Sequence, residues 1–143
     1  MLEIYYGGAK IKDRLCIGVA ITAALRDKNV LLVNFRQDVE NYDKLFDVAP
    51  HLTRLTLAPH VGVRGYFDHA ARVALSIRYE VLVLHGIFDM IDTGQLSSGE
   101  VYEFLSNAPD SIEIICTGRA VDEKFLRIAD KAVKMSPWYE DIR

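Results

Sequence analysis

The sequence contains few of the residues that mark specialised classes of protein. Its 143 residues include two cysteines, four prolines and one tryptophan. Cys16 and Cys116 are a hundred positions apart, a spacing that matches neither a metal site nor a redox motif. We therefore predict two reduced, buried thiols and a cytoplasmic protein.

A large excess of charge of either sign is also absent. The formal net charge is −3 and the isoelectric point is near 5.8, whereas a nucleic-acid-binding surface needs clustered lysines and arginines. No apolar run approaches the roughly 20 residues that span a bilayer, and residues 1–4 do not resemble a signal peptide. The sequence thus predicts neither nucleic acid nor a membrane as a partner.

Over its whole length the sequence alternates between short strand-like segments and segments in which apolar residues recur at helical spacing. Half of the residues are hydrophobic, and the length suits a single domain covering residues 1–143. Short apolar runs predict strands at 2–6, 30–33, 81–84, 112–116 and 132–135, and an alternating pattern predicts one at 52–57. Helical spacing predicts helices at 13–26, 39–48, 66–79, 98–106 and 121–129, with Ser98 as an N-cap and a loop at 58–65.

These strands are continuous apolar runs, which is typical of strands that are buried on both faces. We therefore expect an α/β fold of three layers, in which a mostly parallel sheet carries helices on both faces. In such sheets, ligands bind beyond the carboxyl ends of the strands. The segments to search are 6–12, 34–38, 58–65, 85–92 and 117–119.

The segment between the first strand and the first helix is the richest of these. A phosphate-binding loop needs glycines, a lysine for the phosphates and a hydroxyl for magnesium. Gly7 and Lys12 have the spacing of the first glycine and the lysine of that motif, but Ile11 and Asp13 replace the second glycine and the hydroxyl residue. The loop is predicted to bind phosphate, with an ordinary helix start as the equal alternative, through Gly7, Gly8, Lys10, Lys12, Asp13 and Arg14.

The ends of the later strands supply further candidate cleft residues. His85 is a candidate base or metal ligand, although a histidine that is only hydrogen-bonded is the simpler interpretation. Asp89 is either a magnesium ligand or a solvated acid, and Arg119 either binds an anion or forms a salt bridge with a nearby acid. Asn34 and Thr117 complete this group. No set of residues is predicted as a resident metal site, and no catalytic residue is assigned.

Read in register, the chain resembles the P-loop corrinoid adenosyltransferases, which transfer the adenosyl group of ATP to the cobalt of a reduced corrinoid. The loop of that family reads Tyr-Thr-Gly-Asn-Gly-Lys-Gly-Lys-Thr, and residues 5–12 share its tyrosine, first glycine and both lysines. Thr117-Gly118-Arg119 is similar to the Thr-Gly-Arg of the family, and Ala129-Asp130 to its Ala-Asp.

This resemblance implies a P-loop-like fold, ATP with magnesium, a nucleotide or corrinoid as partner, and a homodimer. The sequence also departs from the pattern of the family. The Asp-Glu pair of the family is here His85-Gly86, and the middle segment is shortened. Two hypotheses follow. The chain is either a short adenosyltransferase that holds the triphosphate with Gly7, Lys10 and Lys12, or a relative with weak or lost activity that binds an anion, a corrinoid or a partner protein in a regulatory or accessory role.

Overall fold

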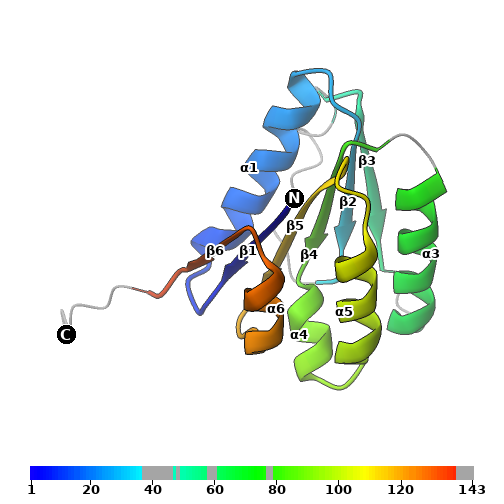
Figure 1. Ribbon diagram of the computed structural model, residues 1–143. Helices are drawn as coiled ribbons and strands as arrows, with labels where there is room; N and C mark the ends of the chain where they lie inside the picture. The colour runs from blue at the N-terminus through cyan, green and yellow to red at the C-terminus, as the bar shows by residue number, and fades with distance from the viewer. Residues whose placement is uncertain (37–46, 48, 58–60, 77–78, 138–143) are drawn as a thin grey trace.

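The computed structural model describes residues 1–36, 47, 49–57, 61–76 and 79–137 of the chain. In these residues six strands form one sheet, in the order β3-β2-β4-β5-β1-β6, and every pair of neighbours is parallel. The expected parallel α/β fold is therefore confirmed (Figure 1). The strands are β1 (Leu2–Tyr6), β2 (Val30–Asn34), β3 (Leu52–Thr56), β4 (Val81–His85), β5 (Glu113–Gly118) and β6 (Lys131–Lys134).

Helices cover both faces of the sheet. Helix α1 (Ile11–Leu25) packs on one face. The other face carries α3 (Val63–Ser76), α4 (Ile87–Asp92), α5 (Ser98–Asn107) and α6 (Glu123–Ile128). Figure 1 shows α1 on its own side of the sheet and these four helices together on the opposite side. The three layers predicted from the continuous apolar strands are thus present.

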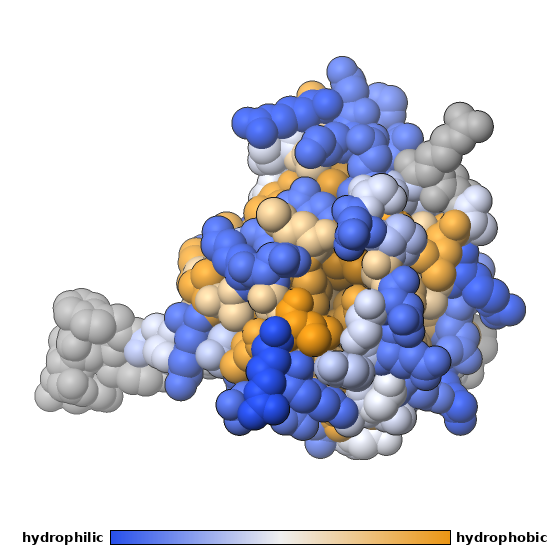
Figure 2. All heavy atoms as spheres, viewed as in Figure 1, coloured by the Kyte–Doolittle hydropathy of each residue, from blue (hydrophilic) through white to orange (hydrophobic). Residues whose placement is uncertain are grey.

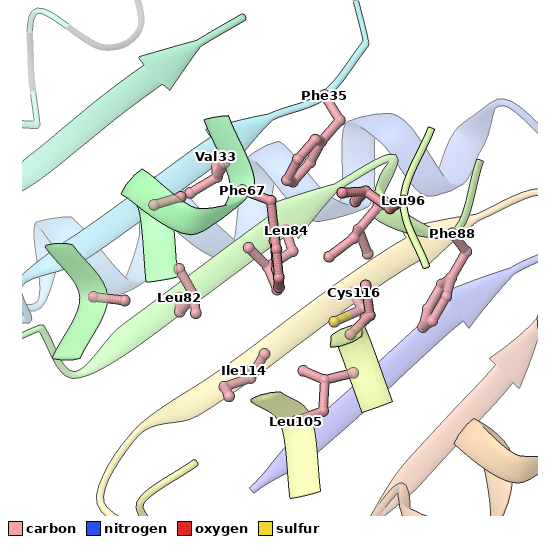
Figure 3. Close-up of a cluster of buried hydrophobic side chains, with 14 of the residues drawn as sticks. Val33, Phe35, Phe67, Leu82, Leu84, Phe88, Leu96, Leu105, Ile114 and Cys116 are labelled. Atoms are coloured by element: carbon pink, nitrogen blue, oxygen red, sulfur yellow. The ribbon is translucent and has the colours of Figure 1, made fainter. Parts of the chain in front are cut away.

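The larger core lies between the sheet and the four helices. Leu82 and Leu84 from β4 and Ile114 from β5 meet Phe67 of α3 and Leu105 of α5 (Figure 3). Aromatic rings pack edge to face within this core, with ring centroids 5.1 Å apart for Phe35 and Tyr66, and for Phe88 and Phe125. Burial of these large side chains supplies most of the driving force for folding.

The second core lies under α1. The helix turns small residues, among them Cys16, Ala20 and Ala24, toward the sheet, so its axis can approach the strands closely. Both cysteines are free and buried, as predicted. Burial raises the pKa of both thiols well above the usual range, so they remain protonated and unreactive.

The structure corrects several predicted boundaries. Helix α4 was not predicted, and α3 begins at Val63, inside the predicted loop 58–65. The N-cap of α5 is Ser97, whose hydroxyl accepts hydrogen bonds from the amides of Gly99 and Glu100 at 3.2 and 3.4 Å. Ser98, the predicted cap, is already helical. The helix predicted at 39–48 lies almost wholly outside the described residues.

The surface is mainly polar at its periphery. On the side drawn in Figure 2, apolar surface shows mainly in the middle of the molecule. None of the helices within the described ranges has the length and apolar character that crossing a membrane requires.

Two carboxylates meet on the sheet face that α1 packs against. Glu113 on β5 forms a side-chain hydrogen bond with Glu3 on the neighbouring strand β1, and this bond, together with burial, raises the pKa of Glu113. The hydroxyl of Tyr5 donates to Glu3 at 3.0 Å, and burial raises the pKa of Tyr5 to about 12. The carboxyl group of Glu113 therefore keeps its proton to a higher pH than a carboxyl group in water does.

Replacing one of these acids should change the dependence of stability on pH. Because the pKa of Glu113 is raised in the folded state, the folded chain holds a proton that the unfolded chain has lost, and stability decreases as pH rises above the ordinary value of 4.5. Since like charges on neighbouring strands destabilise a sheet, we expect Glu113→Gln to raise Tm at pH 7 by about 1–3 °C and to have less effect near pH 4.

Thermal unfolding followed by circular dichroism between pH 4 and 8 measures this effect. Glu103→Gln, which removes an exposed carboxylate from α5, is the control for net charge. Equal shifts in the two variants at every pH would contradict the proposed origin of the effect.

Candidate functional site

A cluster of polar side chains lies where the carboxyl ends of four parallel strands meet. Strand β1 leads into the loop 7–10 and then α1, while β2, β4 and β5 end beside it. The cluster contains Lys12 and Asp13 at the start of α1, Arg36 after β2, His85 at the end of β4, and Thr117 on β5. Parallel pairing brings these residues together from positions spread over the whole chain.

The loop begins at Gly7, a position that only glycine can occupy. Its φ angle is +120°, and a Cβ atom there would lie 2.2 Å from the carbonyl oxygen of Met135. The Gly7 amide donates to the carbonyls of Gly118 and Arg119 at 3.1 and 3.0 Å, and the Ala9 amide donates to Met135 at 3.0 Å. Two of the loop amides are therefore bonded to protein carbonyls and not directed into an open anion-binding site.

Ile11, which stands at the second glycine position of the motif, has an unstrained backbone. Helix α1 begins at Ile11, and within the described residues the one non-glycine residue with a positive φ is Asp27. Ile11 therefore has an ordinary helical conformation, and its side chain is 53% exposed. Lys10 occupies the N-cap position in the right-handed helical region, without a side-chain cap, and Gly8 is exposed.

Lys12 points back into its own loop. The side chain is only 3% exposed, and its Nζ donates to the carbonyl oxygen of Ala9 at 3.3 Å. A second contact, of 4.0 Å, joins this Nζ to Oδ1 of Asp13. The lysine that would bind phosphate in a P-loop is thus buried and already has an anionic neighbour.

Asp13 is the anion around which the cluster is organised. Its Oδ1 lies 4.0 Å from Lys12 Nζ and 3.6 Å from Nε2 of His85, and its Oδ2 lies 3.7 Å from Nη1 of Arg36. Two permanent cations thus face one carboxylate, which stands at the position of the magnesium-binding hydroxyl in a P-loop. In electrostatic terms, the carboxylate takes the place that a phosphate group would take.

His85 is held in place by Thr117. Its Nδ1 lies 3.0 Å from the Thr117 hydroxyl, which also accepts a hydrogen bond of 2.8 Å from the Gly86 amide. His85 is 1% exposed, and burial lowers its pKa in spite of the opposing charge of Asp13. Neither Nε2 of His85 nor Oδ1 of Asp13 has a hydrogen-bond partner among the described residues.

Arg36 is the residue that the sequence analysis missed. Its guanidinium bridges the two acids of the cluster, at 3.7 Å from Asp13 and 3.9 Å from Asp89. Gly86 has a φ of +83°, and a Cβ atom there would lie 2.6 Å from Cγ of Arg36, so the glycine makes room for the arginine. A cation directly after the carboxyl end of β2 was the available signal.

The other predicted residues lie at different distances from this cluster. Asp89 accepts a hydrogen bond of 2.8 Å from the Arg119 amide, which ties α4 to the end of β5. Asn34 holds the turn after β2 by accepting from the Arg36 amide at 3.0 Å. Arg14 lies outside the cluster, because its side chain lines a separate groove along α1.

A cavity of about 600 Å³ opens beside the cluster and lies within the size range of small-molecule sites. It extends from the end of β2 to α4 and the loops that follow α4 and β5. Its lining combines cations, acids and apolar side chains: Phe35, Arg36, Leu57, Asp89, Met90, Asp92, Thr93, Gln95 and Arg119.

The cluster does not have the composition of a resident magnesium site. No group of three or more His, Cys, Asp or Glu side chains in the described part of the chain is placed to hold a metal ion. Lys12 and Arg36, moreover, already balance the charge of Asp13. The residues present therefore do not fit the magnesium ion that the family resemblance implies.

Comparison with known proteins gives two matches. The family described as ATP:corrinoid adenosyltransferase BtuR/CobO/CobP matches residues 1–141. The uncharacterized protein all2391 of Nostoc sp. is 32% identical over 165 aligned residues, which cover 95% of this chain and 43% of the relative. The chain thus spans less than half of that relative. Since the alignment is longer than this chain, the relative also has residues with no counterpart here.

Removal of the Thr117 hydroxyl should destabilise the fold. Thr117→Val leaves the buried Gly86 amide and Nδ1 of His85 without their partner, which costs about 1–3 kcal/mol. Urea unfolding measures this loss. In the control, Thr93→Val, the lost hydroxyl is exposed and donates to the carbonyl of Asp89, so the change should stay within about 0.5 kcal/mol. Equal losses in both variants would contradict the assigned role.

The imidazole of His85 should be neutral at pH 6.5, with its proton on Nε2. Its pKa is lowered by burial, and a proton on Nε2 avoids placing a lone pair against the carboxylate of Asp13 at 3.6 Å. Long-range ¹H–¹⁵N NMR spectra distinguish the two neutral tautomers and the cation. An imidazolium at pH 6.5, or a proton on Nδ1, would rule out this arrangement.

Proposed function

The chain belongs to the ATP:corrinoid adenosyltransferase family, and we propose that it is a member whose phosphate loop is held closed by its own carboxylate. In this proposal the protein binds ATP weakly, transfers the adenosyl group poorly or not at all, and acts as a binding or regulatory protein. The observation that carries the proposal is the position of Asp13 between Lys12, Arg36 and His85.

Electrostatics support this proposal. A triphosphate in the loop would lie close to the carboxylate of Asp13, and the repulsion between two unit charges 4 Å apart is about 4 kcal/mol at an effective dielectric constant of 20. It would also have to separate Lys12 from Asp13 and from the carbonyl of Ala9. In family members with a threonine at this position, the same lysine has no such competitor.

The backbone supports the proposal independently. The amides of Gly7 and Ala9 already donate to the carbonyls of Gly118, Arg119 and Met135. Phosphate binding at a helix start depends on amides that are available to the anion. Rearranging these hydrogen bonds would add to the cost of binding, since the carbonyls of Gly118, Arg119 and Met135 would lose their present donors.

In this proposal the ligand binds in the neighbouring cavity and not in the phosphate loop. Arg36 and Arg119 line it with the apolar side chains of Phe35 and Met90. A ligand with an anionic group and an apolar body matches this lining better than a free inorganic anion does. By family, such a ligand is a nucleotide or a corrinoid, with the corrinoid as a partner or substrate and not as a resident group.

Adenosyl transfer is the second candidate function. It is favoured by the retained strand–loop–helix, in which α1 begins directly after the loop, with Gly7 and Lys12 at the spacing of a P-loop. If the contacts of Asp13 open when ATP binds, the loop amides and Lys12 would become available to the triphosphate.

Asp13→Asn tests the proposal directly. The substitution removes the competing charge and keeps the shape of the side chain, so we expect the affinity for magnesium-ATP to increase by about tenfold or more. Isothermal titration calorimetry of both proteins measures this change. The combined variant Lys12→Ala/Asp13→Asn should lose the gained affinity. Asp68→Asn, which removes an exposed acid from α3 outside the cavity lining, is the control for charge and should match the unmodified protein.

An adenosylation assay with a chemically reduced corrinoid completes the test. The unmodified protein is expected to bind ATP only with a Kd of about 1 mM or weaker and to give no adenosylated product. Micromolar ATP binding together with turnover would overturn the proposal and establish the second candidate. An unchanged affinity in Asp13→Asn would refute the role assigned to this carboxylate.

A further inference from the structure

His85 and Asp13 face each other through two buried atoms that lack hydrogen-bond partners. Neither Nε2 of His85 nor Oδ1 of Asp13 is hydrogen-bonded within the part of the chain that the structure describes. The two atoms are 3.6 Å apart, which is too long for a hydrogen bond. A charged imidazole would draw the carboxylate closer and form an ion pair. The contact is thus one proton and a small movement away from an ion pair.

The charges around the imidazole decide whether it takes that proton. The charged groups that face the ring come from three segments: Lys12 and Asp13 of α1, Arg36 after β2, and Asp89 of α4. Burial and the two cations oppose protonation, the two carboxylates favour it, and the pKa of His85 is lowered as a result. Pairing one of the cations with a further anion would therefore favour the imidazolium.

Arg36 is the cation that a further anion can reach. It belongs to the cluster and also lines the cavity of about 600 Å³. Its Nη1 lies 3.7 Å from Asp13 and 3.9 Å from Asp89, and both distances exceed those of a charge-assisted hydrogen bond. The side chain is 24% exposed. An anionic group in the cavity can therefore compete with Asp13 for the guanidinium.

Thr117 allows the ring to hold either protonation state without moving. Its hydroxyl oxygen lies 3.0 Å from Nδ1 of His85 and accepts a hydrogen bond from the Gly86 amide at 2.8 Å. A hydroxyl can donate one hydrogen bond and accept two. It donates to Nδ1 of the neutral ring, and it can instead accept from Nδ1–H of the imidazolium. The second proton of the ring thus has a partner already in place.

We propose that an anionic ligand in the cavity takes Arg36 from Asp13, and that His85 binds a proton and replaces the arginine beside that carboxylate. The proton comes from solvent and binds Nδ1, while Nε2–H closes on Oδ1 of Asp13. The ligand brings one negative charge and the proton one positive charge, so the buried cluster remains balanced. This inference rests on the proposed function, in which the ligand binds in the cavity beside Arg36. It adds that binding depends on pH and leaves the phosphate loop closed.

The sign of the pH dependence follows from this exchange. The ligand neutralises Arg36 and so raises the pKa of His85, which means that the complex holds a proton that the free protein lacks. Affinity therefore increases as pH falls, and the Kd should decrease by about three- to tenfold between pH 7.5 and pH 5.5. A suitable probe is naphthalenesulfonate, which has an apolar body and an anionic group that does not titrate in this range. Sulfate is the same kind of anion without the apolar body.

Isothermal titration calorimetry in buffers of different ionisation enthalpy counts the protons taken up. We expect about 0.3–1 proton per bound naphthalenesulfonate at pH 6 in the unmodified protein. His85→Gln should bind the probe with no proton uptake and with a Kd that does not change with pH. Asp13→Asn should also take up no proton, because the carboxylate that stabilises the imidazolium is gone. His69→Gln, which removes an exposed histidine from α3, is the control and should keep the uptake.

NMR titration of the unmodified protein tests the exchange without any substitution. Saturation with the probe should move the titration midpoint of His85 upward by about 1 pH unit or more, while the midpoint of His69 stays where it is. Uptake with sulfate as well would support the exchange for a free anion, and uptake with naphthalenesulfonate alone would support it for a ligand with an apolar body.

Two results would overturn the inference, and they differ in what they say about the proposed function. Binding of naphthalenesulfonate without proton uptake, or with the same pH dependence in His85→Gln, would refute the exchange and leave the cavity as the ligand site. If neither probe bound at any pH between 5.5 and 7.5, both the exchange and the assignment of the cavity would be wrong.

Discussion

Parallel pairing of β1, β5, β4 and β2 is the constraint on which the candidate site depends. In a parallel sheet all carboxyl ends meet at one edge, so residues as far apart along the chain as Lys12 and Thr117 converge there. Lys12, Arg36, His85 and Thr117 each lie within a few residues of a strand end. If any strand ran in the opposite direction, its polar residue would lie at the far edge of the sheet. Because the helices bury both faces of the sheet, little water reaches these polar side chains. They therefore depend mainly on one another for hydrogen bonds and opposite charges.

This requirement explains why Asp13 matters more than its single charge suggests. Lys12 is almost completely buried, and a buried ammonium group needs an anion nearby. A bound phosphate normally plays that part in a phosphate loop. In this chain the carboxylate of Asp13, which is part of the protein, lies 4.0 Å from Nζ of Lys12. The position of His85 has a similar explanation. Burial lowers the pKa of its imidazole, so the ring lies against the carboxylate of Asp13 without adding another cation.

Much of this arrangement was predictable, and the misses have physical causes. All six strands of the described residues lie within two residues of their predicted bounds, because a short apolar or alternating pattern leaves little choice. Helix α4 was missed because it is six residues long, and a segment of fewer than two turns shows too little periodicity. Arg36 was not predicted because an arginine after a strand is common. Its role can be recognised only when the acidic residues that it contacts, Asp13 and Asp89, are known. Helix α1 begins at Ile11, two residues before its predicted start, so Ile11 has an ordinary helical conformation.

By itself, the sequence determined the parallel α/β fold, the position of the loop and the departures from the phosphate-loop motif. Local patterns carry this information because hydrophobic periodicity and glycine placement act over a few residues. Only the tertiary structure decided what the departures mean. It placed Asp13 against Lys12, Arg36 and His85, and it turned the amides of Gly7 and Ala9 toward protein carbonyls. Charge balance inside a protein depends on distance in space, and no local pattern records that distance.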